Sequence, residues 1–336
     1  GGVVPSLYIS DPVWTEHRWN AAAASAAWEG ADNWSTPGTP DQLWRAVAEN
    51  QTGGGRTAVV QFDSTVFQLV VGATAGTMTV AVDEQATLTT FGETRIDAGG
   101  VVALAGGTLN AQFVNLNGGV LRGEGVVELG VGPLEGVVRN LDGRIEPGDP
   151  IGVLEVAGDL SLVGGTLAFD LGGTTPGTLH DQIDVGRFAF LSGTLEARLA
   201  NDYTPNVGDQ VSIITAGQEI AGQFDVLDLP GGFFWEIDYL PQEVVLHITG
   251  IGSIAGDFDS SGNVDDGDLA MWEAGFQADT PFTGTGFLAW QRNYGRQNLA
   301  AAIPEPAACV TAALGCLALL GRRRRATPRY ARSSDG

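Results

Sequence analysis

Residues 164–171 read Gly-Gly-Thr-Leu-Ala-Phe-Asp-Leu, and residues 192–199 read Ser-Gly-Thr-Leu-Glu-Ala-Arg-Leu, so a turn and the run after it recur farther along the chain. After the turn in each copy, apolar residues alternate with other residues. Alternation with a period of two indicates a strand that buries one face. Recurrence at this spacing is typical of repeat proteins in which each repeat stacks on the one before it.

Glycine turns punctuate the middle of the chain in the same way. Glycine pairs precede short apolar runs at 99–100, 106–107 and 118–119, and the chain of 336 residues holds 49 glycines. A single repeat cannot bury its inward face alone, whereas stacked repeats share a continuous core. The sequence therefore predicts a mainly β fold. We expect a right-handed parallel β-helix, or solenoid, over residues 59–250, whose last strands form a sandwich-like closure.

Three phrases within this stretch resemble the β-strand repeats of bacterial surface and autotransporter-passenger proteins. They are Gly-Arg-Ile-Glu-Pro-Gly at 143–148, Gly-Val-Leu-Glu-Val at 152–156 and Pro-Asn-Val-Gly-Asp at 205–209. What the resemblance implies is the architecture alone.

The segment 1–58 differs from the rest of the chain because it contains five of the eight tryptophans. These are Trp14, Trp19, Trp28, Trp34 and Trp44. An open solenoid end needs a cover, so one interpretation makes residues 1–58 an N-terminal cap. The other makes the aromatic faces a platform on which sugar rings stack. We expect the cap, with the platform as the alternative.

The segment with the most defined chemistry covers residues 256–269 and reads Gly-Asp-Phe-Asp-Ser-Ser-Gly-Asn-Val-Asp-Asp-Gly-Asp-Leu. When Asp257 is counted as the first position of an EF-hand-type loop, oxygen-bearing residues fall at the positions that bind the ion. The expected ligands are Asp257, Asp259, Ser261, the backbone carbonyl of Asn263, Asp265 and Asp268. Hard oxygen ligands at this spacing select Ca²⁺ over softer metals. An Asp-rich solvated turn is the alternative.

This loop resembles a dockerin type I repeat, whose loop also ends in Asp. Gly262 at the sixth position permits a sharp turn, and Val264 at the eighth is the apolar residue expected to pack against a neighbouring loop. A related copy follows it, in which Trp290 matches Trp272, but the loop of that copy lacks the acidic ligands. The resemblance implies a small helical, calcium-binding module over residues 251–299, with a cohesin-like protein as a candidate partner.

The C-terminal residues 300–336 contain three short segments in order: Pro304-Glu305-Pro306, an apolar run at 307–320, and four arginines. The arginines are Arg322, Arg323, Arg324 and Arg325. Consecutive arginines resist crossing a bilayer, so the rest of the chain is expected on the opposite side from them. The order resembles the PEP-CTERM sorting signal of Gram-negative and planctomycete-type bacteria. That resemblance implies an initial membrane helix, an exosortase-type enzyme acting at the Pro-Glu-Pro box, and a final place at the cell surface. A plain membrane anchor is the alternative.

Charge excludes one class of partner. Positions 1–321 carry 39 acidic and 11 basic side chains, a net charge of −28. Such a body repels phosphate backbones and attracts divalent cations, so we expect no nucleic-acid partner. The two cysteines, Cys309 and Cys316, lie in the apolar run, so no disulfide is expected in the body.

Catalytic motifs are weak. His180, Asp181 and Asp184 lie close in sequence, but a strand that ends in a turn is the better explanation for them. Arginines are sparse among many acids, which disfavours a lyase for anionic polysaccharides. We therefore predict a non-enzymatic, exported surface or matrix protein with a structural or adhesive role. The alternative is an accessory of extracellular polysaccharide degradation that binds glycan and docks through residues 251–299.

Overall fold

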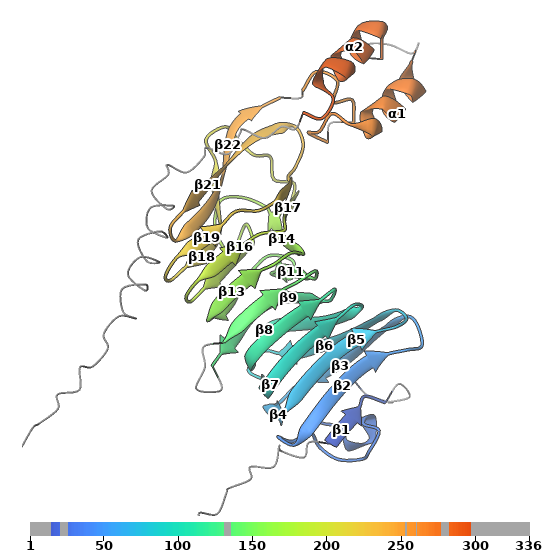
Figure 1. Ribbon diagram of the computed structural model, residues 1–336, viewed down its shortest axis with the longest axis vertical. Helices are drawn as coiled ribbons and strands as arrows, with labels where there is room; N and C mark the ends of the chain where they lie inside the picture. The colour runs from blue at the N-terminus through green and yellow to red at the C-terminus, as the bar shows by residue number, and fades with distance from the viewer. Residues whose placement is uncertain are drawn as a thin grey trace, which may run out of the picture. The chain divides into compact units, whose positions relative to one another are not determined.

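The computed structural model describes residues 15–20, 26–130, 136–252, 254–259, 261–276 and 282–296 (Figure 1). The predicted sorting signal and apolar helix in residues 300–336 lie outside the described residues, as does Trp14. Across the part that is described, no helix has the length and apolar character needed to span a bilayer. The prediction of a mainly β fold is confirmed, because strands account for most of the chain between residues 15 and 251.

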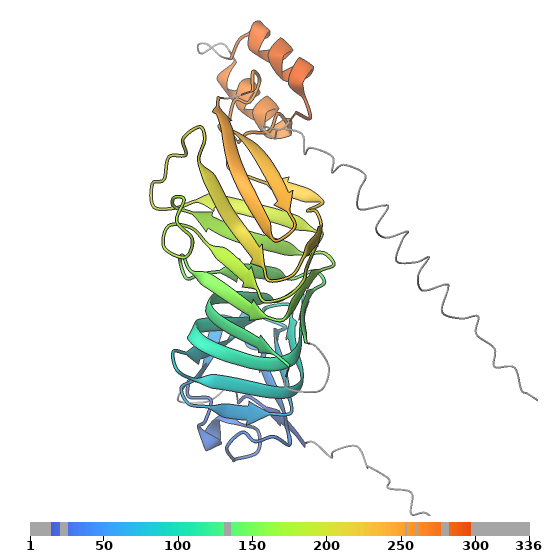
Figure 2. The same cartoon turned by 90° about the vertical axis from the view of Figure 1, so that its left-hand side faces the viewer.

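Strands between residues 15 and 228 wind into a coil with three faces, which we call the parallel coil (Figures 1 and 2). Face 1 contains β1 (Thr15–Arg18), β2 (Trp44–Asn50), β5 (Gln68–Ala73), the ends of β7 (Thr87–Asp97) and β8 (Gly100–Asn117), β10 (Val137–Asn140), β13 (Asp159–Leu162), β16 (Ala189–Leu191) and β19 (Ile220–Gly222). Face 2 contains β3 (Gly55–Val60), β6 (Thr77–Asp83), the starts of β8 and β9 (Val120–Leu129), β11 (Arg144–Pro147), β14 (Thr166–Leu171), β17 (Thr194–Leu199) and β20 (Val226–Asp228). Face 3 contains β4 (Ser64–Val66), the start of β7, the middle of β8, the end of β9, β12 (Val153–Ala157), β15 (Gln182–Val185) and β18 (Gln210–Ala216).

The strands within each of the three faces pair in parallel, and each strand pairs with the equivalent strand of the next turn. On face 2 the register joins Thr57 to Thr79 and, farther along, Thr166 to Thr194. The second of these pairs joins the two near-copies seen in the sequence. Those copies therefore lie directly against each other.

A ladder of aliphatic side chains fills the coil beneath face 2. Its rungs are, in order of stacking, Val80, Val102, Leu121, Ile145, Leu167 and Leu195. Each of these residues is at most 1% exposed. Since neighbouring strands of a sheet lie about 4.8 Å apart, each side chain contacts the equivalent one in the next turn. Stacking of like on like makes the core continuous.

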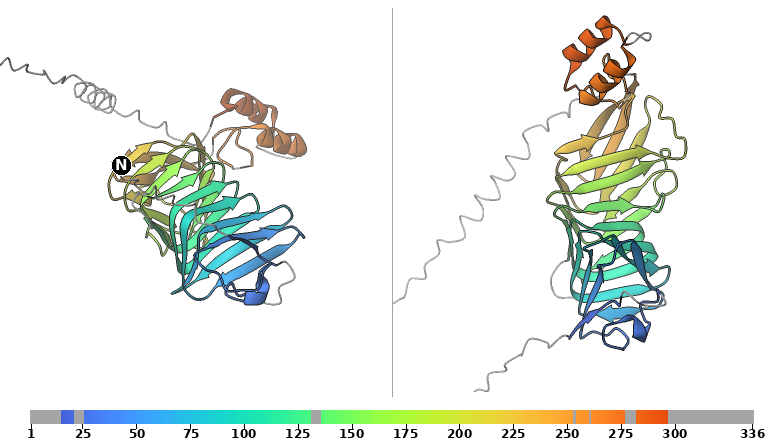
Figure 3. Two further views of the ribbon diagram at one scale, coloured as in Figure 1. Left: turned by 60° about the horizontal axis from the view of Figure 1, so that its bottom comes forward. Right: turned by 90° about the vertical axis from the view of Figure 1, so that its right-hand side faces the viewer.

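The described part of the tryptophan-rich segment is continuous with the coil and is not a separate unit. β1 and β2 already pair in parallel on face 1, and β3 crosses the expected boundary at residue 58 (Figure 3). Trp19, Trp28, Trp34 and Trp44 pack against one another with ring centroids 4.7–6.2 Å apart, and none is more than 7% exposed. These four rings therefore fill the first turns of the coil and present no open face to a sugar ring.

An antiparallel pair closes the last turn. β22 (Glu243–Ile251) pairs with β18 of face 3 on one side and with β21 (Phe233–Leu240) on the other. Trp235 and Ile248 are each 1% exposed and join the same buried cluster as the coil. A reversal of strand direction ends the parallel stacking, so the hairpin β21–β22 acts as a lid on the core.

Helices are few among the described residues. A 3₁₀ turn, η1, covers Ala31–Asn33, and two α-helices, α1 (Asp266–Gly275) and α2 (Gly284–Asn293), follow the strands. Trp272 on α1 lies 4.8 Å from Phe287 on α2, measured between ring centroids, and its indole N–H donates to the carbonyl of Thr283 at 2.9 Å. Aromatic contacts thus hold the two helices together.

Candidate calcium loop and face-2 pocket

Three carboxylates meet in the loop that precedes α1. Asp257, Asp259 and Asp268 each offer an oxygen atom, and these atoms lie within 4.8 Å of one another. Asp257 is 7% exposed and Asp268 is fully buried. Carboxylates at this separation repel one another when ionised, so the group favours either a proton or a cation.

Backbone N–H groups wrap the loop around these carboxylates. Asp268 Oδ1 accepts hydrogen bonds from the N–H groups of Phe258 and Asp259, at 2.6 and 3.1 Å. Asp257 accepts from the N–H groups of Ser261 and Gly262, both at 3.0 Å. Gly262 has a φ of +85°, a left-handed conformation that glycine adopts without strain, as predicted for the sixth position.

Asp268 also fixes the start of α1. Its Oδ2 accepts from the N–H of Asp265 at 2.8 Å, while Asp265 Oδ1 accepts from the N–H of Gly267 at 2.7 Å. The two aspartates form a capping box, and they also place negative charge at the positive end of the helix. The side chain that completes the carboxylate group is therefore held by the helix itself.

The electrostatics of the loop fit a hard cation. Burial raises the pKa of Asp257, the N–H of Gly262 opposes this effect, and the charges of Asp268 and Asp259 raise the pKa further. A divalent ion among the three oxygens would remove that repulsion. Because the donors are all oxygen atoms and carry several negative charges, they suit hard divalent cations, of which Ca²⁺ is one.

The two other side chains predicted as ligands, Ser261 and Asp265, make different contacts in the structure. Ser261 Oγ lies 3.3 Å from the N–H of Asn263, from which it accepts, and 3.4 Å from the Asn263 carbonyl oxygen. Asp265 is exposed and caps α1, outside the group of three carboxylates. Sequence spacing alone placed Asp265 among direct ligands, whereas in the structure its carboxylate satisfies the helix N-terminus.

The segment after α2 closes over the loop. Val264 is fully buried, its N–H donates to the carbonyl of Arg296 at 2.9 Å, and its carbonyl accepts from the N–H of Gly295 at 2.8 Å. Trp290 donates its indole N–H to the Asp265 carbonyl at 2.7 Å. The eighth position thus contacts a neighbouring segment as expected. Among the described residues, the related copy that contains α2 brings together no further group of three Asp, Glu, His or Cys ligands.

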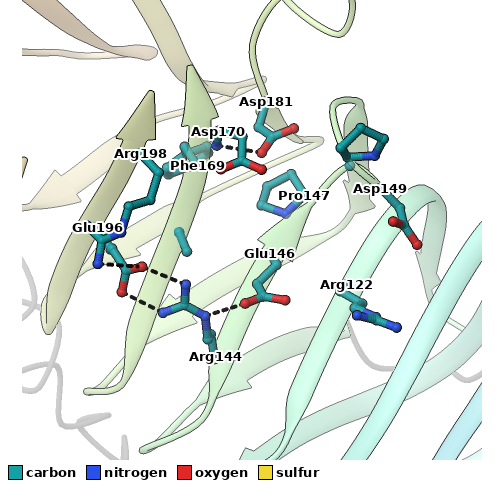
Figure 4. A pocket seen from close by; sticks show the side chains of 13 residues that line it. Arg122, Arg144, Glu146, Pro147, Asp149, Phe169, Asp170, Asp181, Glu196 and Arg198 are labelled. Carbon is teal, nitrogen blue, oxygen red and sulfur yellow. Dashed lines mark hydrogen bonds and ion pairs between the residues drawn. The ribbon is translucent and has the colours of Figure 1, made fainter. Parts of the chain in front are cut away.

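A hollow of about 270 Å³ lies on the outer side of face 2, where β9, β11, β14 and β17 run side by side (Figure 4). We call it the face-2 pocket. Its lining mixes guanidinium groups with carboxylates and includes two prolines, Pro147 and Pro150, beside them. The sequence does not reveal this site, because its residues come from four turns of the coil that differ in length.

Arg144 is the centre of the ion pairs in the pocket. It donates two hydrogen bonds to Glu196, at 2.6 and 2.8 Å, and a third to Glu146 (Figure 4). Glu196 also pairs with Arg198, which in turn pairs with Asp228, both at 3.1 Å. Because of these bonds the pKa of Glu196 lies below its usual value. The network binds the outward side chains of β11, β17 and β20 to one another.

His180 and Asp181 both bond to backbone groups of the fold. The two ring nitrogens of His180 lie 3.1 and 3.0 Å from the carbonyl oxygens of Gly173 and Ser212, deep in the fold. Asp181 is 2% exposed and accepts from the N–H groups of Gly152 and Asp170, at 3.0 and 2.7 Å. These contacts hold the loop between β14 and β15, which supports the structural interpretation of His180 and Asp181. Asp184 lies on the exposed side of β15 and accepts from the hydroxyl of Thr215 at 2.8 Å.

Comparison with known proteins adds no identification. No protein-family model matches the chain, and no curated protein matches it.

Proposed function

We propose that this protein is an exported, non-enzymatic component of a cell surface or extracellular matrix, with a structural or adhesive role. The parallel coil would be a β-solenoid spacer, because stacked turns share one core and each turn added extends the coil. Its winding would be right-handed, since parallel strand crossovers are right-handed in about 98% of cases. Residues 251–299 would be a dockerin-like module that binds Ca²⁺ outside the cell.

The observation that carries this proposal is the meeting of Asp257, Asp259 and Asp268 within 4.8 Å in a loop closed by backbone N–H groups. Bound Ca²⁺ would supply charge neutralisation there and would join the loop to the start of α1 through Asp268. For an extracellular module of this kind the dissociation constant is expected to be on the order of 0.1–1 mM. With a dissociation constant in this range, the concentration of Ca²⁺ outside the cell would control whether the loop is ordered.

Limited proteolysis of the full chain tests the calcium proposal. With 5 mM Ca²⁺ we expect residues 255–296 to be cut about 6- to 50-fold more slowly than in chelator, because an ion with this dissociation constant would stabilise the folded module by a factor of 1 + [Ca²⁺]/Kd. Asp257→Asn and Asp268→Asn remove ligands that lie in the group and should abolish this protection. The measurement is the rate of appearance of the fragments, by mass spectrometry.

Glu273→Gln is the matched control for these variants. It makes the same change of charge on α1, where Glu273 is exposed. It should keep full protection by Ca²⁺. Equal digestion of the wild-type chain with and without Ca²⁺ would remove the calcium proposal.

The proposed export rests on residues 304–306 and on Arg322–Arg325, as a PEP-CTERM-like signal read by an exosortase-type enzyme. Mass spectrometry of the mature C-terminus from a bacterial host that carries this enzyme tests it. A species that ends near Glu305 would support sorting, whereas one that retains Tyr330 would indicate a plain anchor. A full-length chain found only in the cytosol would exclude both.

A further inference from the structure

One arginine side chain of the face-2 pocket takes no part in the surrounding ion pairs. Arg144 and Arg198 are engaged with Glu146, Glu196 and Asp228. Arg122 lies in register with Glu146 on the neighbouring strand, yet its Nε is buried and has no hydrogen-bond partner among the described residues. Arg122 as a whole is partly exposed and lines the pocket, so the rest of its guanidinium group remains for a ligand.

Two carboxylates in the same pocket are equally uncommitted. Among the described residues, no N–H or O–H group donates to the side chain of Asp149 or of Asp170, and neither has an ion-pair partner. Burial and the charge of Glu146 raise the pKa of Asp170, although Arg144 and Arg198 oppose this. Figure 4 shows Arg122 and Asp149 on one side of the pocket and Asp170 on the other. The pocket therefore offers both free donors and free acceptors.

This mixture decides which ligand fits. A ligand anion would meet the carboxylates of Glu146, Asp149 and Asp170, and a ligand cation would meet Arg122. A neutral hydroxyl group suits both kinds of partner, because it donates to a carboxylate and accepts from a guanidinium. Hydrogen bonds to charged groups are also the stronger ones, so several such hydroxyls on one ring would be well held.

The volume and the lining of the face-2 pocket suit a single sugar ring. The pocket has a volume of about 270 Å³, near the lower limit of about 300 Å³ for small-molecule sites. Pro150, which is exposed, provides apolar surface for the C–H groups of a ring. We infer that the face-2 pocket binds one residue of a neutral polysaccharide. This inference goes beyond the proposed calcium-binding function and does not depend on it.

The test is calorimetric titration of the full chain, in chelator, with neutral tetrasaccharides of glucose, mannose, galactose and xylose. At least one of them should bind. Arg122→Met and Asp170→Asn should each weaken that binding about tenfold or more, because each removes a charged partner of a hydroxyl group. Both variants keep the size of the side chain nearly constant, and their melting curves by circular dichroism would show that they fold.

Arg139→Gln is the matched control, since Arg139 is exposed on β10 of face 1 and should not affect the affinity. Two further probes test the charge argument: a galacturonate tetrasaccharide and spermidine. Stronger binding of either one than of every neutral sugar would overturn the inference. So would unchanged affinity in both pocket variants, or no neutral tetrasaccharide bound at 20 mM. Because the titration contains no Ca²⁺, these outcomes leave the calcium proposal unaffected.

Discussion

At the scale of single residues, burial decides what each carboxylate does. Asp257 and Asp181 are both nearly inaccessible, and backbone N–H groups bond to both. Asp257 shares its space with two further carboxylates, which suits a cation. Asp181 joins two parts of the backbone, β14 and the turn before β12, and so acts as a structural tie. The same residue type therefore supports a binding role in one loop and a packing role in the other.

Asp181 should make the coil less stable as the pH rises. Burial raises its pKa to about 7, against the N–H groups of Asp170 and Gly152, which lower it. The unfolded chain releases this proton near pH 4, whereas the folded chain keeps it until about pH 7, so the contribution is lost across that window. At about 1.36 kcal/mol per pKa unit, the loss is on the order of a few kcal/mol. Melting temperatures between pH 4.5 and 8 measure it.

Asp181→Asn should flatten this pH dependence, because its side chain does not titrate. Asp184→Asn is the matched control, on the exposed side of the nearby strand β15, and should keep the wild-type slope. If the Asp181→Asn chain shows the same slope as the wild type, another group is responsible.

Residue patterns in the sequence revealed one of the two sites but not the other. The meeting of Asp257, Asp259 and Asp268 was predictable because these residues are local, within one short loop of known spacing. The face-2 pocket was not, because Arg122, Glu146 and Asp170 lie on three different turns of the coil. Their alignment depends on the length of each intervening turn, which composition does not reveal. The tryptophans left two interpretations open for a similar reason: rings that suit a sugar platform also suit a buried cluster, and only the fold distinguishes the two.

At the scale of elements, stacked turns restrict the backbone more than any single strand does. Gly193 has a φ of +71°, and a Cβ atom added there would lie 2.6 Å from the carbonyl oxygen of Gly165 in the turn beneath. The near-copies at 164–171 and 192–199 thus repeat their glycines because one turn lies directly on the other. This repeat is the part of the fold that the sequence revealed most directly.

Gly193→Ala should therefore destabilise the protein for two reasons, strain at positive φ and a clash with the turn beneath. Gly232→Ala separates them, since Gly232 has a φ of +81° but no atom within 4 Å of the added Cβ. Strain alone costs about 1–2 kcal/mol, and overpacking adds about 1–3 kcal/mol. Chemical denaturation should show the larger loss for Gly193→Ala. Equal losses of unfolding free energy in the two variants would mean that the turn beneath Gly193 moves aside without an energetic cost.

At the scale of the whole molecule, the coil is built from turns of unequal length that share one core. The register joins Thr57 to Thr79 near the start of face 2, but near its end the register makes a longer step along the chain, from Leu195 to Leu227. Inserted loops, such as the one between β14 and β15 that Asp181 holds, absorb the difference. This variation hides the repeat from a search for a fixed period, although the inward aliphatic ladder continues through it. The sequence therefore predicted a mainly β, stacked architecture but could not predict which residues share a face.

A coil of parallel strands must also end, and its last turn exposes both an unpaired edge and an open core. The hairpin β21–β22 acts on both problems here: β22 pairs with the edge of β18 on face 3, and Trp235 and Ile248 cover the core. Exposed strand edges are templates for pairing with other chains. A chain that ends at Pro230 should therefore associate or aggregate, whereas a chain that ends at Gly252 should stay monomeric. Size-exclusion chromatography with light scattering at 10–100 μM compares the two. If both chains are monomeric and melt at the same temperature, the hairpin is not needed as a lid.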